Sequence, residues 1–165
     1  MKIKLVKFSK KHLKESREWL NDKEISKLFN RAYKPLTLTS QQKWYEKVIK
    51  DKSQLIFAIV VDGVYVGNVG LKNIDFLNKK CEYYIFIGDK KYWGKGVGYE
   101  STRQLLSYVK KNLKLHKIYL QVDQKNAPAR KLYFKIGFKE EGILKDELIR
   151  NGKYITMIRM AYFIN

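Results

Sequence analysis

The chain has 165 residues, of which 45% are hydrophobic and 31% charged, a composition that excludes a disordered or membrane-embedded chain. No apolar run approaches the roughly 20 residues of a membrane helix, and residues 1–5 alternate in character unlike a signal peptide, so we expect one cytoplasmic domain over residues 1–165. The net charge of +19 leaves open a scattered lysine-rich surface, an anionic cofactor or substrate, or nucleic acid, the last least favoured because the lysines form no block.

The first half of the chain predicts one strand followed by helices. In order, the expected elements are a strand over 3–7, helices over 10–21 and 24–29, a loop over 31–38, and a helix capped by Thr39 or Ser40. His12 is expected on the surface.

The second half alternates strands and helices. The expected strands are 55–61, 64–74, 80–87, 117–122, 138–149 and 153–164, and the expected helices are 97–112 and 127–136. Asp62-Gly63 and Asn151-Gly152 are hairpin signals. The single cysteine, Cys81, lies in an apolar strand and is expected to be a buried thiol.

A glycine-rich loop joins a predicted strand to a predicted helix. Gly94, Gly96 and Gly98 alternate with Lys95 and Val97. Backbone N–H groups and a helix N-terminus together can bind a diphosphate, with a lysine cation nearby. The G-x-G-x-G spacing matches neither the dinucleotide fingerprint nor the phosphate loop of NTPases. A turn with glycines for close packing therefore remains an alternative.

A second motif lies downstream of this loop. Asn126, Ala129, Leu132-Tyr133 and Gly137-Phe138 form the pattern N-x-x-A-x-x-L-Y-x-x-x-G-F. Together with Trp93–Gly98, it resembles the Gcn5-related N-acetyltransferase (GNAT) superfamily over nearly the whole chain, although the usual Arg or Gln is Trp93 here. The resemblance implies an α/β fold with a mixed, mostly antiparallel sheet and helices on both faces. Parts of the sequence look like ribosomal-protein, spermidine and amino-sugar acetyltransferases.

The resemblance also implies acetyl-CoA as co-substrate. No metal is expected, because the sequence shows no His/Cys/Asp cluster with ligand spacing. The residues that the resemblance assigns to acetyl-CoA are Phe86, Ile87, Gly88, Trp93, Gly94, Lys95, Gly96, Val97, Gly98, Tyr99, Asn126 and Ala129. Tyr133 would be the general acid that protonates the thiolate, with simple packing as the alternative. Glu82 would be the base, acting through water, with a surface or ion-paired carboxylate as the alternative.

The acceptor side is less specified. Its candidate residues are Phe29, Asn30, Arg31, Tyr33, Trp44 and Tyr84, which could equally be core aromatics and a solvated arginine. We rank a nucleotide-linked amino sugar first, protein N-terminal amines second and polyamines third, because the positive charge repels polyamines. A basic nucleic-acid-binding module is the non-enzymatic alternative, no membrane partner is expected, and a homodimer is left open.

Overall fold

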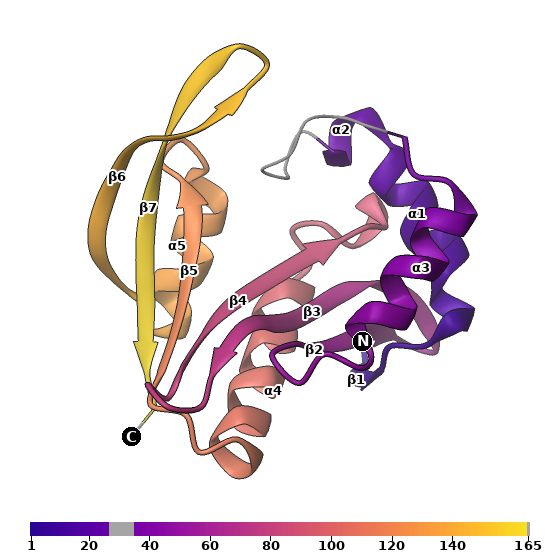
Figure 1. The fold of residues 1–165 in the computed structure, drawn as a ribbon, viewed down its shortest axis with the longest axis horizontal. Coiled ribbons are helices and arrows are strands. Elements are labelled where there is room, and N and C mark those ends of the chain that lie inside the picture. The colour runs from indigo at the N-terminus through magenta and orange to yellow at the C-terminus, as the bar shows by residue number, and fades with distance from the viewer. Residues whose placement is uncertain (27–34, 165) are drawn as a thin grey trace.

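The computed structural model describes residues 1–26 and 35–164, and the order of elements follows the prediction (Figure 1). The strands are β1 (Ile3–Lys7), β2 (Leu55–Val61), β3 (Val64–Asp75), β4 (Lys80–Ile87), β5 (Lys117–Asp123), β6 (Lys139–Arg150) and β7 (Lys153–Phe163). The helices are η1 (Lys10–His12), α1 (Leu13–Asn21), α2 (Lys23–Ser26), α3 (Leu38–Val48), η2 (Lys90–Tyr92), α4 (Val97–Asn112) and α5 (Ala127–Ile136).

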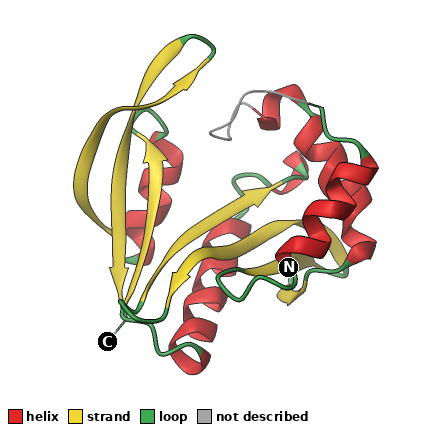
Figure 2. Ribbon diagram, in the orientation of Figure 1, coloured by secondary structure: helices red, strands yellow, loops and turns green. Residues whose placement is uncertain are grey.

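The described strands form one seven-stranded sheet in the order β1-β2-β3-β4-β5-β7-β6 (Figure 2). Every neighbouring pair is antiparallel except β4 and β5. That parallel pairing joins only Lys80–Glu82 to Lys117–Tyr119, and beyond it the two strands diverge (Figure 1). The sheet is therefore split in the middle, and the split is the feature that positions the site.

Helices cover both faces, as predicted. On one face, α4 and α5 contribute Val97, Leu105 and Tyr133 to the main apolar core. On the other, α1 and α3 contribute Leu13 and Tyr45 to a smaller core. Because side chains alternate along a strand, neighbouring residues of β4 serve opposite faces of the sheet.

Both predicted hairpins form. Asp62 and Gly63 have φ of 48° and 88°, and Asn151 and Gly152 have φ of 51° and 73°. Positive φ at both central residues is what a tight two-residue turn between twisted strands requires. Cys81 is fully buried as predicted, and desolvation raises the pKa of its thiol to about 12.

The cap of α3 was predicted wrongly. Thr37 is the N-cap: its Oγ1 accepts a hydrogen bond from the Ser40 N–H at 3.1 Å, and the helix begins at Leu38. The chain remains extended at Thr37, with ψ of 160°, so its hydroxyl reaches the first turn before Thr39 or Ser40 can.

His12 is buried rather than on the surface. Its ring packs against those of Phe8 and Tyr65, with centroid distances of 5.4 and 4.6 Å, and its Nδ1 accepts from the Ser9 N–H at 3.1 Å. Desolvation, aided by the charge of Lys11, lowers its pKa. The capping turn that buries it spans only three residues, too short for a periodic signal.

Candidate functional site

The glycine loop lies between the end of β4 and the start of α4. Gly94 and Gly96 have φ of 70° and 79°, values that residues with a Cβ seldom adopt. A Cβ built at either position would meet no atom within 4 Å. These two glycines therefore set the backbone conformation and leave open space before the N-terminus of α4, rather than serving close packing.

Open space in front of a helix N-terminus is a type of place where proteins bind phosphate groups. α4 has 16 residues, and the N–H groups of its first turn have no partner within the helix, so they point toward the loop. Gly98 differs from these two glycines: it has no positive φ, and a Cβ there would lie in van der Waals contact with Leu132 Cδ2 of α5, at 3.4 Å. Lys95 is exposed beside the loop.

Hydrogen bonds tie the end of β4 to β3 on one side and to the glycine loop on the other. The Gly88 N–H donates to the Val66 carbonyl at 2.8 Å and is therefore already used. Strand alternation directs the N–H and C=O of Ile87 to the opposite side, away from β3. The Ile87 carbonyl accepts from Trp93 Nε1 at 2.8 Å, so Trp93 fastens the glycine loop to this strand end. Among Phe86, Ile87 and Gly88, Ile87 is the residue whose amide faces the gap.

The remaining predicted cofactor residues have different local contacts. Val97 is buried and Ala129 packs against the main core, so their side chains are structural. Asn126 caps α5 by accepting the Ala129 N–H at 3.2 Å. Tyr99 lies on α4 with Lys135 Nζ 5.0 Å from its ring centroid.

Tyr133 projects from α5 into an aromatic cluster at the main core. Its ring lies edge-on to Tyr83 at 6.0 Å and tilted against Phe138 at 5.7 Å. Desolvation raises the pKa of the Tyr133 phenol to about 12, so the group is protonated at neutral pH. Its hydroxyl has no hydrogen-bond partner within residues 1–26 and 35–164, which means that ring packing sets its position.

Glu82 lies at the closed end of the split, opposite Tyr119. Its carboxylate pairs with Lys72 Nζ and accepts from Asn73 Nδ2, both at 3.0 Å, and its side chain is 16% exposed. Phe86 lies four positions farther along the strand, at about 13 Å. Glu82 can therefore receive a proton from the strand end only through intervening water.

The predicted acceptor residues are not brought together by the described chain. Phe29, Asn30, Arg31 and Tyr33 lie outside the described residues. Trp44 is partly exposed on α3 and contacts Phe8 with centroids 6.0 Å apart. The Tyr84 phenol lies against Gly70 of β3, where an added Cβ would come within 2.7 Å of its oxygen.

Trp19 of α1 also belongs to this region. A Cβ on Gly88 would fall 2.1 Å from its indole ring, so Trp19 lies directly on the backbone that follows β4. It also contacts Tyr65 and Phe86. The pairing of a tryptophan with a strand-end glycine far along the chain leaves no local sequence signal.

An ion-pair bridge joins the N-terminal helices to the segment after β4. Lys90 Nζ lies 3.0 Å from Asp22 Oδ2 and also bonds Glu24 Oε2. The Ile25 N–H and Lys90 lower the pKa of Asp22, while Glu24 and Asp22 raise that of Lys90. Both carboxylates are thus already paired with an ammonium group.

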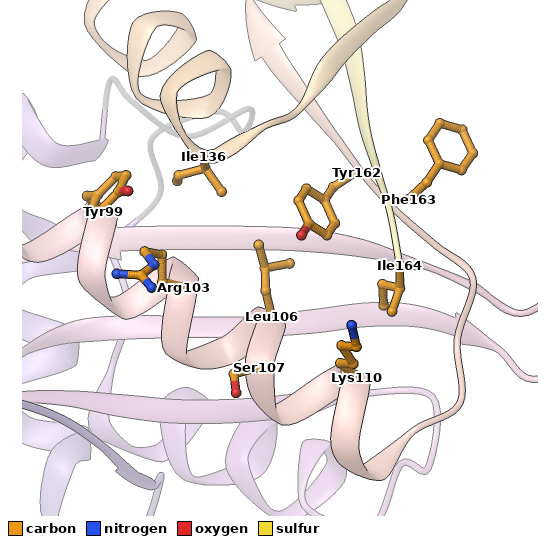
Figure 3. Close-up of a pocket in the computed structure, with 9 residues that line it drawn as sticks. All are labelled: Tyr99, Arg103, Leu106, Ser107, Lys110, Ile136, Tyr162, Phe163 and Ile164. Atoms are coloured by element: carbon orange, nitrogen blue, oxygen red, sulfur yellow. The ribbon is translucent and has the colours of Figure 1, made fainter.

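A groove of about 470 Å³ runs along α4 toward the end of β7 (Figure 3). Arg103, Leu106 and Lys110 line it from the helix, and Tyr162 and Ile164 line it from the C-terminal segment. It shares Tyr99 with the predicted cofactor residues but does not include Tyr133 or the glycines.

Neither a membrane-spanning helix nor a metal-binding cluster is found in residues 1–26 and 35–164. No helix there has the length and apolar character needed to cross a membrane. No group of three His, Cys, Asp or Glu side chains in the same part of the chain could hold a metal ion.

Comparison with known proteins identifies the family. The model of the GNAT acetyltransferase domain matches residues 2–139. A spermidine N(1)-acetyltransferase of Escherichia coli K12 is 37% identical over 119 residues, which are 72% of this chain and 63% of that protein. An uncharacterized N-acetyltransferase of Bacillus licheniformis is 30% identical over 146 residues, covering 85% of this chain and 80% of that protein.

A solved structure is similar over nearly the whole chain. It is that of a spermidine N-acetyltransferase from Vibrio cholerae in complex with CoA and spermine, with a TM-score of 0.91, 28% identity, and coverage of 98% of this chain and 95% of that one. The match to the Escherichia coli protein spans less than two thirds of that relative's length. Fold, glycine loop and family model agree, and the chain belongs to the GNAT family of acetyltransferase domains.

Proposed function

We propose that this protein transfers the acetyl group of acetyl-CoA to a primary amine. The observation that carries the proposal is the pair of open, positive-φ glycines before α4, located beside the split between β4 and β5. A diphosphate at the loop and an extended pantetheine arm along the end of β4 would bring a thioester close to Tyr133. The similar Vibrio cholerae structure, which contains CoA, supports the same cofactor.

The chemistry requires stabilisation of a carbonyl oxygen and protonation of a thiolate. The Ile87 N–H, which faces the gap, polarises the thioester carbonyl. Tyr133 donates its proton to the departing sulfur, a task suited to a phenol whose pKa of about 12 keeps it protonated. The amine nitrogen forms the new bond to the carbonyl carbon as the carbon–sulfur bond breaks.

The amine must also lose a proton, and Glu82 is the proposed receiver through water. Its ion pair with Lys72 and its bond to Asn73 hold the carboxylate at the base of the split. Proton transfer over the intervening distance requires a water chain between the amine and this carboxylate. Replacing Glu82 with Gln should therefore reduce turnover without reducing acetyl-CoA affinity.

For the acceptor, we propose a polyamine of the spermidine class. The similar proteins from Escherichia coli and Vibrio cholerae are named as spermidine acetyltransferases, which favours this class over the amino sugar that we ranked first from the sequence. Asp22, which follows α1, and Glu24, which lies in α2, are carboxylates of the type that binds ammonium groups, and Lys90 pairs with both.

We also propose that the protein assembles into an oligomer. One structure of the Vibrio cholerae spermidine N-acetyltransferase is dodecameric, with a TM-score of 0.83 and 28% identity to this chain. Light scattering coupled to size-exclusion chromatography measures the assembly directly. A monomer at micromolar concentration would contradict this proposal and leave the enzymatic one intact.

A panel of amines tests the activity and the acceptor together. Spermidine, a short peptide with a free N-terminus and a UDP-linked amino sugar are each incubated with acetyl-CoA, and free CoA is measured. Spermidine should be turned over fastest. Faster turnover of another amine would overturn the polyamine proposal alone, whereas the absence of acetyl-CoA binding by calorimetry would overturn the acetyltransferase proposal.

A further inference from the structure

Tyr83 occupies a place between the two functional parts of the proposed site. It lies on β4, is 2% exposed, and belongs to the main core. Its hydroxyl approaches α4, whose first turn follows the glycine loop, and its ring approaches α5, which carries Tyr133. No motif singled it out in the sequence.

The hydroxyl of Tyr83 belongs to a hydrogen-bond chain with a fixed direction. Thr102 Oγ1 lies 2.7 Å from the Gly98 carbonyl, and a carbonyl can only accept, so the Thr102 proton is used there. The Tyr83 oxygen lies 2.6 Å from Thr102 Oγ1 and must therefore donate to it. The chain runs from Tyr83 through Thr102 to the carbonyl of Gly98, which lies in the first turn of α4.

The ring of Tyr83 has a separate contact. It meets the Tyr133 ring edge-on, at 6.0 Å and an interplanar angle of 85°, and it also lies 6.0 Å from Phe138. Edge-to-face contacts fix the relative orientation of two rings. Because ring packing alone sets the position of the Tyr133 hydroxyl within the described chain, removal of the Tyr83 ring should let that hydroxyl move.

We propose that Tyr83 is a positioning residue that holds the first turn of α4 through its hydroxyl and the Tyr133 phenol through its ring. The inference rests on the proposed function, because it assumes that the loop binds acetyl-CoA and that Tyr133 is the acid. It assigns separate kinetic effects to two parts of one side chain: the hydroxyl acts on cofactor affinity and the ring on turnover.

The hydroxyl is tested by removing the bond from each end. Tyr83→Phe, Thr102→Val and the double variant are compared for acetyl-CoA binding by calorimetry. Each single variant should raise the dissociation constant about 2- to 10-fold, the usual effect of one hydrogen bond, and the double variant should be no worse than either. Unchanged binding, or independent addition of the two effects, would overturn this half of the proposal. Tyr45→Phe is the matched control, since Tyr45 is a buried tyrosine of the opposite face.

The ring is tested by Tyr83→Leu and by Tyr83→Met, whose unbranched side chain adapts to an irregular space if the leucine variant does not fold. Relative to Tyr83→Phe, either should lower kcat at least about tenfold, because general acid catalysis depends on placement. In a Tyr133→Phe background, the same change should lower kcat less than about twofold. An equal loss in both backgrounds would show that the effect does not pass through Tyr133.

The two proposals fail in different ways. If Tyr133→Phe is as active as the native protein, the general-acid role falls and the ring half of this inference falls with it. If Tyr133→Phe is impaired but Tyr83→Met retains full kcat, only the positioning role is overturned. The calorimetric comparison needs no turnover, so it decides the hydroxyl half in either case.

Discussion

The proposed cofactor side of the molecule differs from the proposed acceptor side in how it is encoded in the sequence. The cofactor side comprises residues 94–99, α4 and α5, and the acceptor side comprises α1–α3. On the proposed cofactor side, Gly94, Gly96 and the cap residue Asn126 specify the backbone conformation within short stretches of sequence. On the acceptor side, contacts join residues far apart in the chain, such as Trp19 with Gly88 and Asp22 with Lys90. A motif can therefore identify the cofactor without identifying the amine.

The largest expected effect isolates catalysis on the cofactor side. Tyr133→Phe keeps the ring and removes the proton donor, so kcat should fall at least about tenfold, toward the 10²- to 10⁴-fold typical of general acid catalysis. Acetyl-CoA affinity should not change. Tyr162→Phe is the control, because Tyr162 lies in the same aromatic cluster through Phe138 but lines the groove beside α4. Full activity of the Tyr133 variant would show that another group protonates the thiolate.

The next largest expected effect tests whether the backbone of the glycine loop binds the cofactor. Gly96→Val puts a side chain into the open space before α4, so acetyl-CoA affinity should fall at least about tenfold through loss of charge-assisted hydrogen bonds to phosphate. Gly63→Val is a matched control, since Gly63 also has positive φ, at 88°, with no atom within 4 Å of an added Cβ. Both variants should lose similar stability, about 1–3 kcal/mol, from the same backbone strain.

Calorimetry of the two valine variants separates strain from binding. If both bind acetyl-CoA as the native protein does, the loop is only a turn. If both lose affinity equally, the loss comes from general destabilisation. Only a loss confined to the Gly96 variant supports the loop as the diphosphate site.

The sequence predicted most of the fold because its signals are local. Alternation, helical periodicity and two Gly-containing hairpins fix the elements, and the motif around Asn126 and Gly137 places α5 to the residue. The local predictions that were wrong concern short caps, at Thr37 and around His12. In these turns a hydroxyl group or a ring has several candidate partners within one turn.

The site was predicted only in part, for the same reason. The positions and positive φ of Gly94 and Gly96 agree with the predicted loop, which stays a prediction as a binding site. The use of the Gly88 amide by Val66 and the bridge from Tyr83 to Thr102 depend on tertiary pairing and have no sequence period. Trp44 and Tyr84 contact Phe8 and Gly70, and their role as acceptor contacts stays a prediction.

A smaller effect examines the acceptor side. Lys90→Met leaves Asp22 and Glu24 without their ammonium partner, so the KM for spermidine should fall by a factor of a few at low salt and less at high salt, because exposed charges are screened. Lys91→Met is the control: it removes the same charge one residue away, from a side chain that has no ion pair within the described residues. An equal decrease in both variants would indicate a general effect of net charge.

The smallest expected effect concerns pH, which should leave the ratio of two kcat values unchanged. Desolvation raises the pKa of Tyr133 to about 12, above the ordinary value of 10, so the proton that it donates remains in place as pH rises through 10. The kcat of the native protein divided by that of Tyr133→Phe should therefore be the same at pH 8 and pH 10.5, and the division cancels the ionisation of the amine. A phenol of ordinary pKa would lose about half of this advantage at pH 10 and more at 10.5. The same raised pKa means that the Tyr133 phenol ionises at lower pH in the unfolded state than in the folded state. Its contribution to folding stability is therefore fully present below pH 10 and is lost as pH rises toward 12. Circular dichroism at each pH confirms that the compared proteins are folded, and a ratio that halves near pH 10 in folded protein would place the phenol in water rather than in the aromatic cluster.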